Sequence, residues 1–294
     1  MKRPFPRLPI DQLSPLMGEY GRVVGARRVR SVGYLCVFLF VLAAAWNVAE
    51  IDLAKLSANI GNFGDYFDRI LKLDNQQRVW TDSAEWFWGW KHWAPLLLET
   101  LLIAYVGTII GAVLGLVLCF LASANLVRTA WVRWIARRTL EIARTVPGLV
   151  FALIFVIAFG LGPVPGVLAL ALHTMGVLGK QYYELVENID MKPVEGVSST
   201  GSGWITTVRF AALPQVQAGF VSYGLLGFEI NVRSATVMGF VGAGGIGQYL
   251  LEAIRKFYYA DVSALLVVII TTVILIDLVS EYLRHRLISA DTVQ

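Results

Sequence analysis

The sequence has little charge and few of the residues that form disulfides or bind metals. Charged residues make up only 16% of the 294-residue chain, whereas hydrophobic residues make up 56%. This balance excludes a disordered chain and exceeds the apolar share of an ordinary globular domain, so many side chains are expected to face lipid. Cys36 and Cys119 both lie in apolar runs, which predicts inert thiols. The three histidines are scattered and predict no metal site.

The sequence also lacks the motifs by which a chain holds ATP or a dinucleotide. The P-loop pattern G-x-x-x-x-G-K-S/T does not occur, because Lys180 follows its glycines at the wrong spacing. GAGGIG at 242–247 matches G-x-G-x-x-G, but an apolar run of helical length precedes it where a short strand is needed. We interpret these glycines as a sharp, closely packed turn at the end of a span. The chain itself is therefore expected to bind no cofactor and not to be an enzyme.

Six stretches are apolar enough to cross a bilayer, whose core needs about 20 helical residues. They predict an all-α integral membrane protein with six transmembrane helices, at roughly 32–48, 95–122, 140–161, 164–186, 216–240 and 262–282. Lys and Arg are concentrated at 2–30, 128–144, 180–209 and 284–286, which predicts that these segments are cytoplasmic. The basic excess therefore indicates cytoplasmic loops and not a nucleic-acid surface.

This topology places both ends of the chain inside the cell. Residues 1–31 and 284–294 are expected to be cytoplasmic tails, and 49–94 a periplasmic loop or an interfacial helix. That loop carries five tryptophans, namely Trp80, Trp86, Trp88, Trp90 and Trp93. Tryptophan favours the headgroup layer, but the pattern leaves the role of the loop open.

The second apolar stretch has glycines at every fourth position, namely Gly107, Gly111 and Gly115. On a helix this spacing forms a smooth stripe that another backbone can approach closely. We predict tight helix packing at these glycines, and the pattern says nothing about a substrate.

The fifth stretch carries charges that are costly inside a membrane. Glu229 and Arg233 lie four residues apart, on one helical face. One interpretation is a polar lining of a solute path, in which Asn231, Ser234 and Thr236 add hydrogen-bonding groups and the arginine favours an anion. The other is an internal Glu–Arg pair that only holds helices together. Both interpretations stay open.

A polar segment, EGVSSTGSGWITTVRFAALP at 195–214, separates the fourth and fifth stretches. It could be a long connector, but we interpret it as a docking element through which a soluble partner moves the helices. Its spacing resembles the cytoplasmic signature of ATP-binding-cassette importer permeases, which reads E-A-A, three residues, G, nine residues, I-x-L-P. The matching residues are Glu195, Gly201, Leu213 and Pro214, and the departures are Gly196, Val197 and Ala211.

Within that family, two further stretches resemble the phosphonate importer permeases. They are RTVPGLVFALIF at 144–155 and FEINVRSATVMGFVGAGGIGQYLLEAI at 228–254. The resemblance implies the type I importer fold, also called MetI-like, with a core at 95–283 and an ATPase-coupling loop at 189–215. It also implies a multi-pass protein of the bacterial inner membrane.

The same resemblance implies the partners. A second copy of the permease would complete the pore as a homodimer, and two ATP-binding-cassette ATPase subunits would use ATP and Mg on the inner side. A periplasmic phosphonate-binding protein would deliver the solute from outside. Methionine-type permeases share the general plan, so a permease for methionine or another small solute is an alternative. An ion-coupled secondary transporter and a membrane scaffold without transport are alternatives of other classes.

Overall fold

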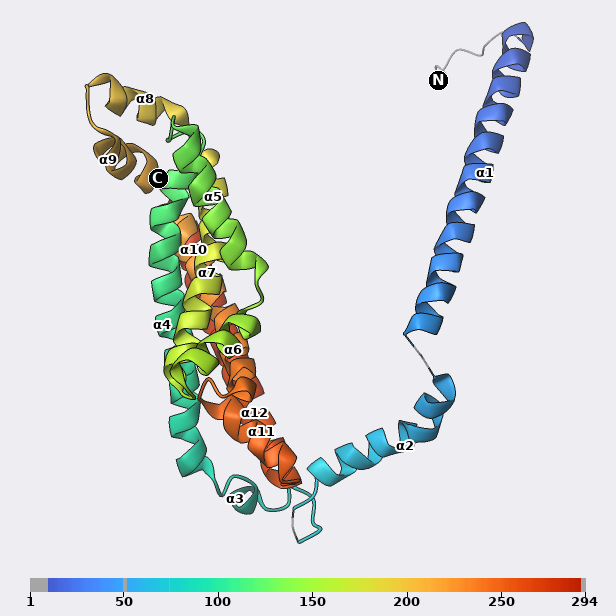
Figure 1. Cartoon of the computed structure of the whole chain (residues 1–294), viewed down its shortest axis with the longest axis vertical. Helices are drawn as coiled ribbons and strands as arrows, with labels where there is room; N and C mark the ends of the chain where they lie inside the picture. Colours follow the sequence, from blue (N-terminus) through green and yellow to red (C-terminus); the bar gives the residue numbers. More distant parts are fainter. Residues whose placement is uncertain (1–9, 50–51, 74, 292–294) are drawn as a thin grey trace, which may run out of the picture. The chain divides into compact units, whose positions relative to one another are not determined.

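The computed structural model describes residues 10–49, 52–73 and 75–291, and these are helical almost throughout (Figure 1). The predicted all-α fold class is therefore confirmed. By its internal contacts the chain divides into two compact units, Met1–Asp65 and Tyr66–Gln294. Residues 1–9 and 292–294, which belong to the two expected tails, lie outside the described residues.

The first unit is dominated by one long helix, α1 (Ile10–Val48). Its apolar part, Arg22–Val48, is long and apolar enough to cross a membrane, and none of it is buried within the first unit. The helix begins well before residue 32, where the first span was expected to start. Part of the expected cytoplasmic tail is therefore a continuation of the same helix.

The connection after α1 contains a second helix, α2 (Leu53–Ile70), which crosses the boundary between the units. Asp52 caps its start, because the carboxylate accepts hydrogen bonds from the backbone N–H groups of Ala54 and Lys55 at 2.9 and 3.0 Å. Exposed apolar side chains recur every three or four residues, at Leu53, Leu56, Ile60, Phe63 and Phe67. The helix is thus amphipathic, as the interfacial alternative for 49–94 requires.

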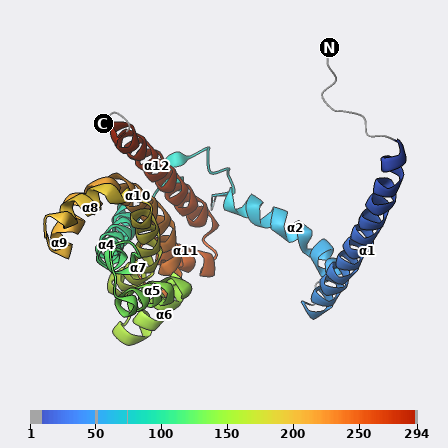
Figure 2. The same ribbon diagram turned by 90° about the horizontal axis from the view of Figure 1, so that it is seen from above.

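The second unit is built around α7 (Pro163–Glu187), which packs against four other helices. These neighbours are α4 (Trp90–Ala122), α5 (Ala130–Thr145), α6 (Gly148–Phe159) and α10 (Leu213–Met238). α12 (Tyr259–Asp291) packs in turn against α10. Seen from above, α4, α7 and α10 lie side by side (Figure 2).

Short elements lie at both ends of this unit (Figure 1). At one end are α8 (Met191–Ser199) and α9 (Trp204–Thr207), followed by the π-helical turn η1 (Val208–Ala212), which runs directly into α10. At the other end are α3 (Ser83–Trp86), the 3-10 turn η2 (Gly239–Val241) and α11 (Ile246–Arg255).

The expected third span, 140–161, is not one helix. α5 and α6 are bent by 86° at Val146 and Pro147. Proline is the physical reason, because its ring disfavours the helical conformation at the preceding residue, and Val146 is extended with ψ 123°. His173 of α7 donates a hydrogen bond to the Val146 carbonyl at this break (3.1 Å). The prediction of a continuous span is therefore wrong, and α5 is a separate helix with four arginines.

In the part of the chain that the structure describes, three helical segments are each long and apolar enough to cross a membrane, namely Arg22–Val48, Trp90–Ala122 and Tyr259–Arg286. Two bent pairs raise this number to five if each pair counts as one span, Ala130–Thr145 with Gly148–Phe159 and Trp204–Val241 with Ile246–Arg255. α7 is not among them, although four other helices surround it. The number of six spans stays a prediction.

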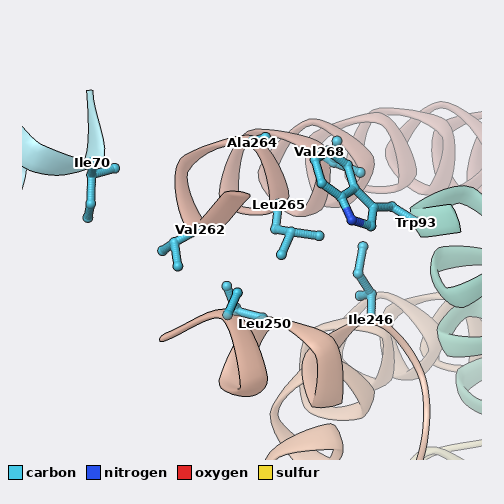
Figure 3. Packing of buried hydrophobic residues seen from close by; sticks show 9 residues of the cluster. Ile70, Trp93, Ile246, Leu250, Val262, Ala264, Leu265 and Val268 are labelled. Atoms are coloured by element: carbon cyan, nitrogen blue, oxygen red, sulfur yellow. The ribbon is translucent and has the colours of Figure 1, made fainter. Parts of the chain in front are cut away.

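The end of the unit that carries α3 and α11 has its own hydrophobic core. Trp93 of α4 is fully buried there with Ile246 of α11 and Leu265 of α12 (Figure 3). Two other tryptophans, the half-buried Trp86 and the exposed Trp88, bind the start of α12. Trp86 Nε1 donates to Ser263 Oγ (2.9 Å), and Trp88 Nε1 donates to Asp261 Oδ1 (2.8 Å). The Trp-rich stretch thus fastens the beginning of α4 to the beginning of α12.

Candidate functional site

The segment that resembles the permease signature forms two short helices separated by a turn. Asp190 begins α8, and its carboxylate accepts a hydrogen bond from the backbone N–H of Lys192 (3.0 Å). Glu195 lies within α8 with an exposed side chain, and its carbonyl accepts hydrogen bonds from the hydroxyls of Ser198 and Ser199. Gly196 and Val197 lie in the same helix. The carboxylate of Glu195 is therefore available to a partner.

Gly201 makes the turn between α8 and α9. Its φ of 78° lies in the left-handed region, and a Cβ built on it would meet nothing within 4 Å. The requirement for glycine is therefore conformational and not steric. Past this turn, Trp204 Nε1 donates to the carbonyl of Leu126 (3.1 Å), which ties α9 to the connection between α4 and α5.

Hydrogen bonds and an ion pair hold the base of this segment. Gln215 of α10 accepts from the backbone N–H of Asp190 (3.1 Å) and donates to its carbonyl (3.2 Å), so the two ends of the segment are fastened together. Arg137 of α5 pairs with Glu187 at the end of α7. Glu187 also accepts from the backbone N–H of Ala124 (2.7 Å). Ala211 is buried in η1, and Leu213 and Pro214 form the first turn of α10, where proline needs no helical partner for its nitrogen.

The three spaced glycines of α4 all lie against α7. A Cβ on Gly107 would be 2.7 Å from the Leu170 Cβ, and one on Gly111 would be 2.7 Å from the Ala171 carbonyl oxygen. Gly115 faces Gly179, whose nitrogen would be 3.0 Å from such a Cβ. The two helices approach so closely that side chains on this stripe would push them apart.

GAGGIG forms a sharp turn between η2 and α11. Gly242, Gly244 and Gly245 have φ between 77° and 86°, and a Cβ on Gly247 would be 1.8 Å from the Thr236 carbonyl oxygen. The backbone N–H of Ile246 donates to Thr100 Oγ1 (2.9 Å), which fixes the turn to α4. The helix α10 precedes this turn, so the βαβ setting of a dinucleotide site is not present. The turn interpretation accounts for these glycines.

Glu229 and Arg233 of α10 form an ion pair that extends to α12. Arg233 Nη2 lies 2.9 Å from Glu229 Oε1, and its Nη1 lies 3.4 Å from Asp277 Oδ2. Arg284 Nη2 lies 3.4 Å from the other oxygen of Glu229. These four side chains are called the α10–α12 charge network below. The Arg233 side chain is 48% exposed, whereas that of Glu229 is 12% exposed.

Asn231 does not belong to this network. It is buried, and its Nδ2 donates to Thr108 Oγ1 of α4 and to Thr174 Oγ1 of α7, both at 2.8 Å. The hydroxyls of Ser234 and Thr236 donate to carbonyls of their own helix. Of the five polar residues that the sequence singled out on α10, only Glu229 and Arg233 are therefore brought together.

Two members of the charge network were not singled out as site residues by the sequence analysis. Arg284 was the first residue of the expected cytoplasmic tail, which stays a prediction, and Asp277 was given no role. They lie seven residues apart on α12, and a seven-residue spacing puts both on one face of a helix. Two charges at that spacing in an apolar helix are the signal that could have identified them.

Residues 107–289 match the family described as "Binding-protein-dependent transport system inner membrane component", and the chain belongs to this family. It is thus an inner-membrane permease component of an ATP-binding-cassette importer, a class that works with ATPase and binding-protein partners.

Individual relatives and a solved structure agree with this family. The chain is 37% identical over 250 residues to a phosphite transport system permease protein of Stutzerimonas stutzeri, covering 85% of this chain and 86% of that protein. It is 51% identical over 121 residues to a putative cryptic phosphonate transport system permease protein of Escherichia coli, covering 41% of this chain and 99% of that protein. An inward-facing structure of the MetNI methionine ABC transporter matches with a TM-score of 0.57 at 20% identity, over 66% of this chain and 95% of that one. The last likeness confirms the MetI-like fold and carries no information on the solute.

Proposed function

We propose that this permease provides the membrane path for phosphonate or a related phosphorus oxyanion such as phosphite. The names of its relatives support this class of solute, since they are phosphite and phosphonate permeases. The structural observation that supports it is the half-exposed Arg233, a cation on a helix that belongs to a bent, apolar span.

The position of Arg233 is incompatible with lipid. A guanidinium facing hydrocarbon is costly, so charged side chains in spans face a bundle interior or a wet cavity. Within the second unit, the other helices leave 48% of this side chain uncovered. The uncovered face of α10 must therefore meet water or protein from outside this unit, and contact with water is what a helix lining a translocation path has.

We propose that a second copy of the permease covers this face and completes the pore. The chain itself would hold neither ATP nor Mg; two ATPase subunits would bind both and dock on α8 and α9. Glu195 and Gly201 support the docking, because one is an exposed carboxylate and the other forms the turn between the two helices. The ends of the chain would lie in the cytoplasm with the basic loops.

The physical chemistry of the solute explains this division of labour. A phosphonate carries one or two charges, and moving an ion into hydrocarbon costs many kcal/mol. The permease must therefore offer a hydrated cavity that opens to one side at a time. A site in that cavity must also release its solute quickly, which requires modest affinity. Selection can then be left to the binding protein outside.

The test is uptake by proteoliposomes that contain the permease with its ATPase, with ATP inside and the binding protein outside. We expect uptake of radiolabelled methylphosphonate or phosphite that requires ATP, the ATPase and the binding protein together. Radiolabelled methionine serves as the solute control and is expected not to accumulate. Uptake without the ATPase would show an ion-coupled transporter, and uptake of methionine alone would overturn the proposed solute.

A further inference from the structure

The carboxylate of Glu229 lies between two guanidinium groups from different helices. Its Oε1 is 2.9 Å from Arg233 of the same helix, and its Oε2 is 3.4 Å from Arg284 of α12. Each oxygen therefore has its own arginine. Asp277 adds a second carboxylate, but among the described residues its ion pair, at 3.4 Å, is with Arg233 and not with Arg284.

This geometry suits an oxyanion better than a single carboxylate. Guanidinium groups present planar forks of N–H donors that match carboxylate and phosphate oxygens. A phosphonate or phosphite has several oxygens on a tetrahedral phosphorus, so two guanidinium groups can each take a different oxygen. In the structure the two carboxylate oxygens of Glu229 bind these two guanidinium groups instead.

The network also has hydrogen-bonding capacity that it does not use. Among the described residues, Arg284 Nε and Asp277 Oδ1 are buried and have no hydrogen-bond partner. A buried donor without an acceptor is destabilising, and each such group in a native structure requires an explanation. An additional anionic oxygen beside Arg284 would supply the acceptor that its Nε lacks.

We propose that Arg233 and Arg284 together hold the phosphorus oxyanion in transit, and that Glu229 is a built-in competitor that occupies both arginines when the path is empty. The proposal rests on the function proposed above. The competing carboxylate has two consequences: it keeps two cations in the span neutralised without solute, and it weakens solute binding so that release is fast. Arg284 thereby becomes a solute-contacting residue and not part of a tail.

The first experiment measures ATP-dependent uptake of phosphite or methylphosphonate by the reconstituted complex. Arg233→Gln and Arg284→Gln are each expected to lower uptake by about tenfold or more, the effect of losing a charge-assisted hydrogen bond. Arg286→Gln is the matched control, because Arg286 lies two residues beyond Arg284 on the same helix, is exposed, and places its guanidinium over the ring of Tyr282 and not in the α10–α12 charge network. It is expected to keep the uptake of the unmodified complex.

A neutral double variant separates solute binding from mere helix pairing. Glu229→Gln combined with Arg284→Gln removes one charge of each sign, so it restores neutrality that Arg284→Gln alone disturbs. If the arginine holds the solute, the double variant assembles normally yet takes up about tenfold less solute than Glu229→Gln, which keeps both arginines. If the network only pairs α10 with α12, the double variant recovers transport along with assembly, and the proposal is overturned.

Glu229→Gln alone tests the competitor role. Binding of methylphosphonate to the assembled permease–ATPase complex in nanodiscs, followed by 31P NMR, is expected to tighten by about tenfold, because the solute no longer displaces a carboxylate. Unchanged or weaker binding would refute the competitor. If the unmodified complex shows no ATP-dependent uptake of either anion, the proposed function fails; if it transports and Arg284→Gln transports equally well, only this inference fails.

Discussion

Replacing Gly111 by alanine tests the contact between α4 and α7, on which the second unit is built. The added Cβ would lie 2.7 Å from the Ala171 carbonyl oxygen, 2.7 Å from the Thr174 Cβ and 3.0 Å from the Met175 nitrogen. Two of these atoms are backbone atoms and the third is a Cβ atom, so the clash cannot be relieved by the rotation of a flexible side chain. To restore an ordinary contact of 3.4 Å, the helices must shift apart by roughly 0.7 Å.

The size of the effect follows from two opposing terms. Overpacking a well-packed contact costs about 1–3 kcal/mol. Replacing glycine by alanine within a helix favours folding by about 1 kcal/mol. The net effect is that the free energy of unfolding falls by about 1 kcal/mol, which lowers the melting temperature of a chain of this size by about 2–4 °C. Gly111→Val adds two more methyl groups at the same point and is expected to lower it further.

The measurement is thermal unfolding of the purified permease in one detergent, followed by tryptophan fluorescence. Gly33→Ala in α1 is the matched control, because a Cβ built there would meet nothing within 4 Å in the first unit apart from the adjoining backbone of its own helix. This substitution raises helix propensity without a clash, so the variant is expected to have the melting temperature of the unmodified protein or a slightly higher one. If Gly111→Ala behaves as Gly33→Ala does, the close approach of α4 and α7 is wrong.

Three further changes test other parts of the structure. Gly201→Val forces a β-branched residue to a φ of 78°, which costs about 1–2 kcal/mol of backbone strain. We expect the complex to assemble and hydrolyse ATP but to take up no solute. Gly203→Ala is the control, because Gly203 has a φ of −70° that alanine adopts freely, and it is expected to retain uptake. Asn231→Ala removes two interhelical hydrogen bonds and is expected to lower stability by about 1–2 kcal/mol, measured against Ser234→Ala, whose hydroxyl bonds only its own helix. Lys72 and Arg78 lower the pKa of Asp68 below its ordinary value; its stabilising contribution is thus present above that ordinary value and lost as the pH falls through the lowered one. The Val79 amide donates to the Leu71 carbonyl, and its protection factor (the intrinsic exchange rate at a given pH divided by the observed rate) should therefore stay constant at neutral pH and fall only below about pH 4. A loss of protection already near pH 6 would contradict this.

Features with a short sequence period could be predicted because they depend only on local geometry. The four-residue glycine spacing pointed to a close helix contact, and Gly107, Gly111 and Gly115 do face α7. A Gly/Pro run such as that at 160–166 is likewise typical of a tight reversal, and Gly160 and Gly162 have φ values of 89° and 141° between α6 and α7. The Glu229–Arg233 pair followed from its i, i+4 spacing.

Features that depend on distant partners could not be predicted in the same way. Hydropathy is continuous across 140–161 and does not register the backbone restriction that Pro147 imposes, although the proline itself was a signal. Arg284 follows the last apolar stretch, so charge counting placed it in a tail, whereas α12 continues past it to Asp291. Asn231 was grouped with its charged neighbours because only the packing of α4 and α7 shows that it lies on another face.

The contacts of α10 differ in kind on its two sides, and this difference determines which side can yield when the helix moves. Towards α4 and α7 it is held by the buried Asn231, with two hydrogen bonds of 2.8 Å. Towards α12 it is held by two ion pairs at 3.4 Å, from the half-exposed Arg233 and from Arg284, whose side chain is 28% exposed, and water or an anion can replace such long contacts more readily than the buried hydrogen bonds of Asn231. α10 also continues without interruption from α9 through η1, so a displacement of α9 reaches Arg233, about 30 Å along the helix axis from Leu213, without crossing a loop. We therefore expect α4, α7 and α10 to move together and the interface with α12 to open, which places the weak contacts of the permease where a passing oxyanion needs them.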